Sequence, residues 1–445
     1  MRTTRRRITR TTGIAAATLM LACTSPAAVA AAEPPNAPLT LETAIHLVRE
    51  NNPALKAAAE DISAAEARVT QSKSGYYPQI SVAAGYTAIT PVSEMSIGGG
   101  ALKFMPNDNY DAKLTAKMEL LDFGRRDGNV DLALSGKKMA EQTLELSRRE
   151  LSWQTVQLFY GILFLRESIK VEETEIAALN KALDYTKKRY QAGAATPFDI
   201  FSTEVRLAAA RNRTLDMEHE LRRNELTLHR LTGIGESDPL LLQGSFAGKT
   251  TVDHLSTGLV DQALAQRLEL KLSREGETVA KQRQSLAMKE SLPVVTGALS
   301  YGFTNGYQPD IYHIRNNIAG NLHLEVPLLT GYRTSAKQQE RAAMLRAATQ
   351  RRVDTQQQIK NDVDETIHAL DTSTEKMITT EAQVKQAELA AQHARIRYEN
   401  GMATTLDLLD TEASLAQAGL ARVQAAYACI LNTYKLKRAT GAVFW

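Results

Sequence analysis

Two carboxylates near the C-terminus have a spacing that suits the attraction of cations. Asp407 and Asp410 lie three positions apart in a helix-forming segment, and residues three apart share one face of a helix. Repeated around an axis by several copies, such a pair would form a ring of carboxylates that attracts cations in a pore. Capping is the alternative interpretation for Asp407, and for Asp199 in a related segment. Thr404 and Thr196 precede these two residues by the three positions of a capping box.

The rest of the sequence gives no pattern of residues for catalysis. The eight histidines are isolated, and none has the spacing of zinc ligands. Neither a nucleophile elbow nor a phosphate-binding loop is present. Basic and acidic residues nearly balance, 53 against 50, so no strong field indicates a nucleic acid partner. We therefore expect no enzymatic activity, no metal site, no cofactor and no nucleic acid partner.

The segment that contains Asp407 occurs twice in the chain. Residues 189–199, Arg-Tyr-Gln-Ala-Gly-Ala-Ala-Thr-Pro-Phe-Asp, return 208 positions later as residues 397–407, Arg-Tyr-Glu-Asn-Gly-Met-Ala-Thr-Thr-Leu-Asp. This period is too long for a solenoid and indicates two tandem copies of one fold. We expect repeat 1 at residues 33–233 and repeat 2 at residues 259–445. Between them lies an equatorial linker at residues 234–258, rich in Gly, Ser, Pro and Thr.

Residues 1–32 have the pattern of an export signal. Five arginines precede a short apolar stretch, and small residues suited to cleavage follow it. Ordinary signal-peptide cleavage is one interpretation, and lipidation of Cys23, which follows Met-Leu-Ala, is the other. Beyond the signal no run of 18 apolar residues occurs, so we expect no transmembrane helix. The mature chain keeps Cys429 and, if lipidated, Cys23, so it has no disulfide available and must rely on packing or oligomerisation.

Each repeat begins with a helical segment that leads into two strands. The first helical segment is at residues 39–75 and is interrupted at Asn51-Asn52-Pro53. The second is at residues 259–290 and contains no proline. Apolar and polar residues then alternate with the period of two that indicates a strand with one apolar face. Each pair of strands is predicted to form a hairpin around a loop rich in Gly, Pro and Asn. The predicted strands are at about residues 78–90, 110–121, 293–304 and 316–327.

The strands are followed by very long helical segments. Residues 125–190 contain no proline, and residues 333–398 contain neither proline nor glycine. A helix of about 65 residues is roughly 100 Å long, which indicates a coiled coil or helical array. Sharp turns at Gly193 and Gly401 then start returning helices of about 35 residues.

Four strands in one chain are too few for a membrane barrel. Strands of about ten residues with one apolar and one polar face match those of transmembrane barrels. Lipid offers the backbone no hydrogen bonds, so such a sheet must close on itself. The smallest membrane barrels have about eight strands. Several copies must therefore share one barrel, and two, three or four copies would supply about 8, 12 or 16 strands.

The order of these elements resembles the TolC-like outer membrane factor family over essentially the whole mature chain. The segment Leu-Leu-Asp-Phe-Gly-Arg-Arg at residues 120–126 is similar to the family's Leu-Phe-Asp-Gly-Gly-Arg element after its second strand. The duplicated Arg-Tyr-x-x-Gly-x-x-Thr-x-x-Asp turns and the Ala-Thr-Gly ending at residues 439–441 complete the match. In repeat 2 the post-strand element departs from the pattern, because Leu329-Thr330-Gly331-Tyr332 lacks the aspartate.

The resemblance implies a mainly α fold with a β-barrel part, built from the tandem-duplicated helix-strand-strand-long helix-helix repeat. It also implies a homotrimer, in which a 12-stranded outer-membrane β-barrel continues into a periplasmic α-helical barrel. The family serves as the exit duct of tripartite efflux or type I secretion systems. The implied partners are two further copies, a periplasmic adaptor protein, an inner-membrane transporter and outer-membrane lipid. The implied location is the outer membrane, with the helices in the periplasm.

The resemblance also assigns residues to an entrance at the periplasmic tips. By motif position, its closed constriction matches Asp407, Asp410, Asp199 and Tyr398. In one well-known type an arginine just after the glycine latches the tip; here that position is Ala403, so this latch is expected to be missing or replaced. The tips expected to dock the adaptor are Gly193, Ala194, Ala195, Thr196, Gly401, Met402, Ala403 and Thr404.

A periplasmic coiled-coil adaptor or a structural scaffold without a barrel is the alternative. It would explain the export signal and the long helices, but not four alternating strands in matching positions of two repeats. An adaptor would also carry a β-rich, lipoyl-like module between its helices, and the sequence shows no such module. A coiled coil bound to the cell wall is a third interpretation, and the same strands argue against it.

Overall fold

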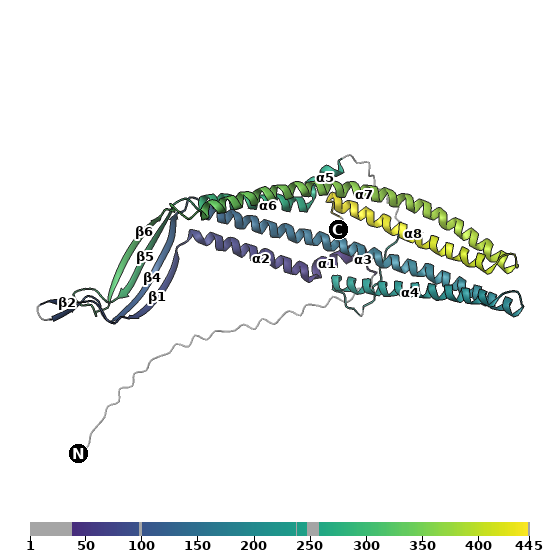
Figure 1. The fold of residues 1–445 in the computed structure, drawn as a ribbon, viewed down its shortest axis with the longest axis horizontal. Coiled ribbons are helices and arrows are strands. Elements are labelled where there is room, and N and C mark those ends of the chain that lie inside the picture. The colour runs from purple at the N-terminus through teal and green to yellow at the C-terminus, as the bar shows by residue number, and fades with distance from the viewer. Residues whose placement is uncertain (1–37, 98–99, 237, 247–257, 444–445) are drawn as a thin grey trace, which may run out of the picture. The chain divides into compact units, whose positions relative to one another are not determined.

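Two sets of helices and strands follow one another in the same order in the chain (Figure 1). The computed structural model describes residues 38–97, 100–236, 238–246 and 258–443. The predicted signal at residues 1–32 and the proposed lipidation of Cys23 therefore lie outside the described residues. The first set comprises α1 (Leu41–Asn51), α2 (Pro53–Lys73), a 3-10 turn η1 (Ser74–Tyr76), β1 (Gln79–Ala88), β2 (Glu94–Ile97), β3 (Gly100–Lys103), β4 (Asp108–Leu121), α3 (Arg125–Gln191) and α4 (Pro197–Thr232).

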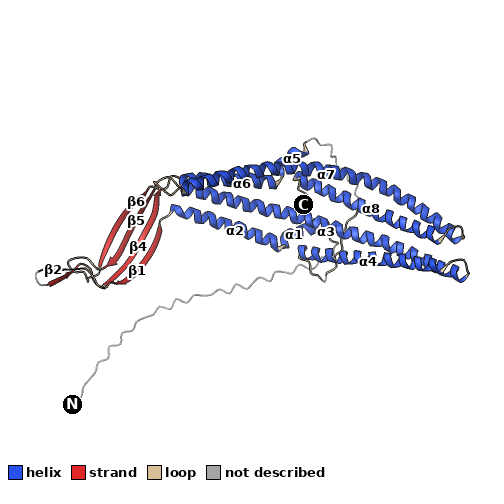
Figure 2. Cartoon of the chain, in the orientation of Figure 1, coloured by secondary structure: helices blue, strands red, loops and turns tan. Residues whose placement is uncertain are grey.

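The second set repeats this order without a small hairpin. It comprises α5 (Leu259–Gln266), α6 (Leu268–Lys289), β5 (Val294–Thr304), β6 (Arg315–Glu325), α7 (Arg333–Glu399) and α8 (Thr405–Thr440). Most of the chain is helical, with one main sheet (Figure 2). The two long helices, α3 and α7, each have 67 residues, which corresponds to about 100 Å. None of the described helices is both long and apolar enough to cross a membrane.

Both repeats interrupt their first helix, by different means. In repeat 1 the side chain of Asn52 accepts a hydrogen bond from the Ala54 N–H at 2.9 Å, and Pro53 starts α2, a position that tolerates proline because its N–H is not needed. In repeat 2 the interruption at Arg267 needs no proline. The Arg267 guanidinium binds Glu269 at 2.8 Å and Asp362 on α7 at 2.6 Å, which holds the extended residue in place.

The Asp-Phe-Gly-Arg element makes the turn from strand to long helix. Asp122 accepts hydrogen bonds from the N–H groups of Gly124, at 3.1 Å, and Arg126, at 2.6 Å. Gly124 has a φ of +78°, a value that favours glycine. In repeat 2 Thr330 takes the place of the aspartate, and its hydroxyl accepts the Thr334 N–H at 3.4 Å. A side-chain hydrogen bond to the first turn of the long helix is therefore kept where the sequence motif departs from the family pattern.

The main sheet is antiparallel, in the order β1-β4-β5-β6. The register places apolar residues side by side in one row and polar or small residues in the next, as the alternation predicts. One row consists of Val82, Leu114, Tyr301 and Ile318, and the next of Ala83, Lys113, Gly302 and Asn317. The four predicted strands are therefore present, with an apolar and a polar face. Both hairpins lie in one sheet because β4 pairs with β5.

The first strand loop contains structure that the alternation did not predict. β2 pairs with β3 in an antiparallel hairpin, with Glu94 opposite Lys103, and their side chains form an ion pair at 3.4 Å. Each strand has only four residues. This is too short for a period of two to stand out from the Gly- and Pro-rich surroundings.

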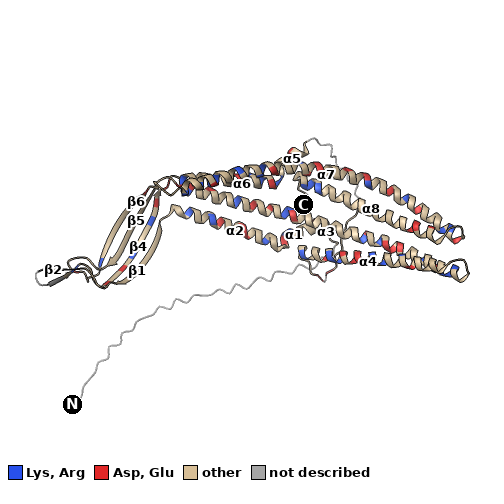
Figure 3. Cartoon of the chain, viewed as in Figure 1, with Lys and Arg blue, Asp and Glu red and all other residues tan. Residues whose placement is uncertain are grey.

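The helices pack in a defined order. Towards the sheet, α3 lies between α2 and α6, and α7 packs on α6. Towards the Gly193 and Gly401 turns, α3 lies between α4 and α8, and α7 packs on α8. Charges of both signs are spread along these helices (Figure 3), in keeping with the nearly balanced composition. We call α3 with α4 hairpin 1, and α7 with α8 hairpin 2.

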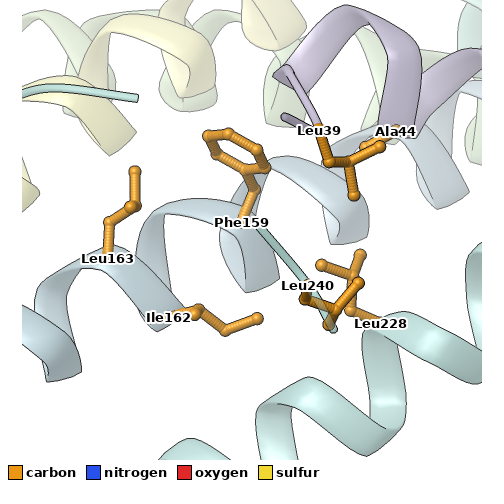
Figure 4. Close-up of a cluster of buried hydrophobic side chains, with 7 residues drawn as sticks. All are labelled: Leu39, Ala44, Phe159, Ile162, Leu163, Leu228 and Leu240. Atoms are coloured by element: carbon orange, nitrogen blue, oxygen red, sulfur yellow. The ribbon is translucent and has the colours of Figure 1, made fainter. Parts of the chain in front are cut away.

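Part of the inter-repeat segment packs into the core. Leu39 and the segment around Leu242 form a short parallel bridge, in which the Leu39 N–H donates to the Leu241 carbonyl at 2.7 Å. Leu240 joins a buried apolar cluster that includes Phe159 on α3 and Leu228 on α4 (Figure 4). Residues 238–246 therefore hold α1, α3 and α4 together rather than serving only as a spacer, which composition alone did not indicate.

Candidate functional site at the two helical turns

Two turns of the same geometry join the helices of each hairpin. Gly193 and Gly401 have φ values of +74° and +71°, and a Cβ at either position would meet nothing within 4 Å. The backbone angle, and not lack of space, is therefore what requires glycine. Of the eight predicted tip residues, Ala195 and Ala403 are half-buried and the other six are exposed. Those six are Gly193, Ala194, Thr196, Gly401, Met402 and Thr404.

Each turn is followed by a complete capping box. The Asp199 carboxylate accepts the Thr196 N–H at 2.8 Å, and the Thr196 hydroxyl accepts the Asp199 N–H at 3.3 Å. Asp407 and Thr404 repeat this arrangement at 2.9 and 3.1 Å. The bond from the backbone N–H of the capping threonine holds the pKa of each aspartate below its usual value. The capping alternative for these aspartates is therefore realised.

Asp410 is paired with a residue of the other repeat. Its Oδ1 lies 2.7 Å from Nη2 of Arg206 on α4, so the ion pair joins hairpin 1 to hairpin 2. The repeat counterparts of Arg206 and Asp410 are Ser414 and Ser202. Two serines cannot form an ion pair, so the Arg206–Asp410 pair has no equivalent at the matching positions of the other repeat. The two expected cation-attracting carboxylates are thus engaged within the chain, Asp407 in a cap and Asp410 with an arginine.

Tyr398 lies inside the protein rather than at its surface. Its side chain is 2% exposed, and its hydroxyl lies 2.8 Å from that of Thr186 on α3 and 3.2 Å from that of Thr405 on α8. Its ring packs against Tyr185, with centroids 5.3 Å apart, and the Arg189 guanidinium lies over its face. In this conformation Tyr398 cannot line an entrance. It positions hairpin 1 against hairpin 2.

Sequence reasoning missed the partners of these residues. Arg206, Thr186 and Tyr185, whose hydroxyl donates to the Glu399 carbonyl at 2.6 Å, were not singled out. Arg206 carried a usable signal, because it and Asp410 are charged residues of opposite sign whose repeat counterparts are uncharged. Among the described residues, no group of three or more His, Cys, Asp or Glu is placed to hold a metal ion.

The comparison with protein families decides what these two repeats belong to. The sequence model of the outer membrane efflux protein family matches residues 44–234 and 259–442, which together cover most of the chain. The chain belongs to the outer membrane efflux protein family. Members of this family are channels in the outer membrane that reach into the periplasm, and not enzymes. The family predicted from the order of elements and the duplicated turns is therefore confirmed, as is the outer-membrane location.

Individual relatives are distant but match over nearly their full length. The chain is 24% identical to the outer membrane protein TolC of Vibrio cholerae over 402 residues, 89% of each chain. It is 22% identical to the pyoverdine export outer membrane protein OpmQ of Pseudomonas putida over 396 residues, 85% of this chain and 80% of the relative. The crystal structure of VceC from Vibrio cholerae superposes with a TM-score of 0.75 at 20% identity, covering 91% of this chain and 97% of that one.

Proposed function

We propose that three copies of this chain form a passive exit duct through the outer membrane. A shared 12-stranded barrel would continue into a periplasmic tunnel of helices, which receives cargo from an inner-membrane transporter through a periplasmic adaptor. The observation that carries this proposal is that each chain has two open sides that suit one another. A duct need not bind what it passes, so we assign the choice of cargo to the transporter.

The sheet has an exposed apolar face and two outer edges. Five of the large apolar side chains on that face are 59 to 77% exposed, which suits lipid far better than water. Within the described residues, the outer edges of β1 and β6 pair with no other strand. Unpaired edges are not tolerated in lipid, so β1 of one copy would pair with β6 of the next. The five side chains are Ile80, Val82, Leu299, Ile318 and Leu322.

An aromatic belt supports the membrane assignment of the sheet. Tyr86 and Tyr110 are direct partners in the register, with ring centroids 5.2 Å apart. Tyr301 and Phe303 lie at the corresponding end of β5, 5.6 Å apart. All four occupy the ends of the strands that are remote from the long helices. Aromatic residues gather at the membrane–water interfaces of outer-membrane barrels.

The helices have open sides that match in the same way. Val205 and Leu215 lie on α4, 8 and 18 residues from its start, and are 68 and 61% exposed. Leu389 and Ile378 lie on α7, 10 and 21 residues before its end, and are 52 and 64% exposed. α4 begins at its turn and α7 ends at its turn, so these apolar positions lie at similar distances from the turns. They would therefore meet if α4 of one copy packed on α7 of another.

The open edges of the sheet and the open sides of the helices belong to the same two sides of the chain. β1, α2 and α4 form one side, and β6 and α7 form the other. Joining unlike sides gives a head-to-tail interface that closes into a ring. Four strands per copy reach the minimum of about eight with two copies and 12 with three. The resemblance to the outer membrane factor family favours three.

The parts of the chain take the following roles in this proposal. Residues 1–32 are an export signal, with Cys23 as a possible lipidation site, and residues 33–233 and 259–445 are the two repeats joined by residues 234–258. The turns at Gly193 and Gly401 form the periplasmic tips that dock the adaptor. The closed entrance is formed there by Asp199, Asp407 and Asp410, with Tyr398 holding the hairpins in position behind them. A scaffold without a barrel leaves the exposed apolar face of the sheet unexplained.

Disulfide trapping between copies tests this assembly. With Cys429 replaced by serine, Val205→Cys combined with Leu389→Cys should give a covalent ladder that ends at three chains on a non-reducing gel. The matched control, Val205→Cys with Leu215→Cys, places both thiols on the same open side and should give no ladder. Ladder formation by the control alone, or chains that stay single in both, would contradict the head-to-tail trimer.

A further inference from the structure

Three buried glutamates lie where hairpin 1 meets hairpin 2. Glu172 and Glu175 on α3 are 0 and 8% exposed, and Glu412 on α8 is 4% exposed. Carboxylates are almost never buried to this degree unless they are paired. None of the three takes part in the capping boxes or in the Arg206–Asp410 pair described above. Neither the caps nor the turns require them.

Each hairpin supplies one arginine to its own glutamates. Arg213 on α4 donates from Nε to both oxygens of Glu172 at 3.1 Å, and from Nη2 to Glu175 at 2.6 Å. Arg395 on α7 binds both oxygens of Glu412, with Nη2 2.6 Å from Oε2. Both arginine side chains are about half exposed, 45 and 44%. The acids are therefore buried more deeply than the bases that neutralise them.

Neighbouring contacts place Glu175 and Glu412 in the same seam. One turn beyond Glu175, Leu179 packs against Leu409 of α8. One turn before Glu175, Val171 of α3 lies close to Gly419 of α8. A Cβ added to this glycine would be only 3.0 Å from the Val171 side chain. Because α3 and α8 run antiparallel here, the stretch between these contacts brings Glu175 towards Glu412. Burial raises the pKa of Glu175, and the charges of Glu172 and Glu412 raise it further against the opposing effect of Arg213.

Part of this cluster is specific to repeat 1. The Arg395–Glu412 pair has a repeat counterpart in Lys187 and Glu204, 3.2 Å apart. The counterparts of Glu172, Glu175 and Arg213 are Thr380, Gln383 and Ala421. Repeat 1 therefore adds two acids and one base to a position where the repeat as such needs one pair.

We propose that these five side chains form a proton-dependent clasp between the hairpins, closed when Glu175 holds a proton and weakened when it ionises. The charged groups that face one another are Glu172 and Glu175 from α3, Arg213 from α4, Arg395 from α7 and Glu412 from α8. Three carboxylates meet two guanidiniums, so one proton makes the cluster neutral. With all three carboxylates ionised, the seam buries an unbalanced negative charge, which is costly away from water.

The direction of the pH effect follows from linkage. The pKa of Glu175 is raised in the packed state, so packed hairpins bind its proton more tightly than separated ones. The stabilisation from this proton is complete below the ordinary pKa of a glutamate. It is lost as the pH rises through the raised value. The clasp is thus strongest in mild acid, and we infer that a rising pH eases separation of the hairpins at the entrance, a consequence that rests on the proposed duct function.

Thermal unfolding of the full chain in detergent, followed across pH, tests the clasp without relying on channel activity. Glu175→Gln keeps the size of the side chain and mimics its protonated form. Its Tm should equal that of the unmodified protein in mild acid and exceed it increasingly as the pH rises. The matched control is Glu173→Gln, which changes the same residue type at an exposed neighbouring position and should show no pH-dependent difference. A Tm of Glu175→Gln that is lower by the same amount at every pH would overturn the clasp, because it would mean that Glu175 serves only as a partner of Arg213.

Two further measurements separate the clasp from the duct. Glu412→Gln removes the facing charge from hairpin 2, and should reduce the gain in Tm that Glu175→Gln gives at high pH; an unchanged gain would contradict the seam. In planar bilayers, conductance of the unmodified protein should rise with pH while that of Glu175→Gln stays at the low-pH level. If no channel forms, the duct proposal fails while the Tm result still decides the clasp. If channels form and both proteins respond to pH alike, the gating role is refuted.

Discussion

At the scale of single residues, the acidic positions expected at an entrance serve first to build the turns. Asp199 and Asp407 accept the N–H of the threonine that caps the following helix. Asp410 is held by Arg206, and Tyr398 is buried among hydroxyl partners. A residue can hold a turn together and still lie at an entrance once several copies meet. The two roles separate when the side chains are changed one at a time.

Replacing Asp407 by alanine should loosen the first turn of α8 in a pH-dependent way. Because the pKa of Asp407 is lowered in the folded chain, its contribution is present above the ordinary pKa of an aspartate and is lost as the pH falls through the lowered value. Amide hydrogen exchange of residues 405–411 should be faster in the variant at neutral pH and similar to that of the unmodified protein in strong acid. Equal exchange at neutral pH would show that the cap contributes nothing.

Tyr398→Phe should weaken the contact between the hairpins without leaving a cavity. The ring and its packing remain, but the bonds to Thr186 and Thr405 are lost. Each such hydrogen bond contributes about 1 kcal/mol. In planar bilayers the variant should open more often than the unmodified protein, whereas Tyr312→Phe, which alters an exposed tyrosine, should not. An unchanged opening frequency would limit Tyr398 to a packing role.

At the scale of elements, the sheet has one face for lipid and one for water. Ile318 is 73% exposed in the single chain, and its neighbour Asn317 points to the opposite face because side chains alternate along a strand. The apolar row that contains Ile318 and the polar row that contains Asn317 each run across all four strands, since the register is continuous at these positions. A charge placed at these two adjacent positions should therefore have very different effects.

Ile318→Lys should destabilise the membrane-inserted protein, while Asn317→Lys should be tolerated. A lysine facing lipid in a barrel costs about 2–4 kcal/mol near the middle of the bilayer. Urea titration in lipid vesicles, read by heat-modifiable gel mobility, measures this difference. Equal loss of stability in both variants would mean that the two faces of the sheet are not in different environments.

At the scale of the whole molecule, copies placed around an axis would bring equivalent side chains together. Asp407 and Asp410 lie close to the turn at Gly401, so three chains would present six carboxylates there, of which three are offset by Arg206. The charge at such an entrance would be smaller than the aspartates alone suggest. What remains should still attract multivalent cations.

Asp407→Ala combined with Asp410→Ala should raise single-channel conductance and weaken block by multivalent cations in planar bilayers. Arg206→Ala removes the partner of the Asp410 carboxylate. This variant should therefore strengthen block of the channel by multivalent cations. The pair of variants thus separates the charge of the entrance from loosening of the tip. Unchanged block in the double variant would exclude these aspartates from the narrowest point.

Much of the architecture could be read from local patterns. The alternation of residues 112–120 depends only on neighbours two apart, and α3 and α7 follow from long segments free of proline. Gly193, Gly401 and the threonines after them indicated both turns and both caps, since a capping box is complete within four residues. The duplication itself could be recognised from the sequence, because a tandem copy preserves order and spacing.

Contacts between distant parts of the chain could not be read in this way. Asp410 finds Arg206 across 204 positions, and Tyr398 is buried because α3 and α8 close around it. The meeting of Glu175 with Glu412 likewise depends on which faces of two long helices come together. Helix faces with similar amphipathic patterns can pack in several ways, and the sum of all contacts selects one. Partner choice, burial and the shifted pKa of Glu175 therefore belong to the tertiary structure alone.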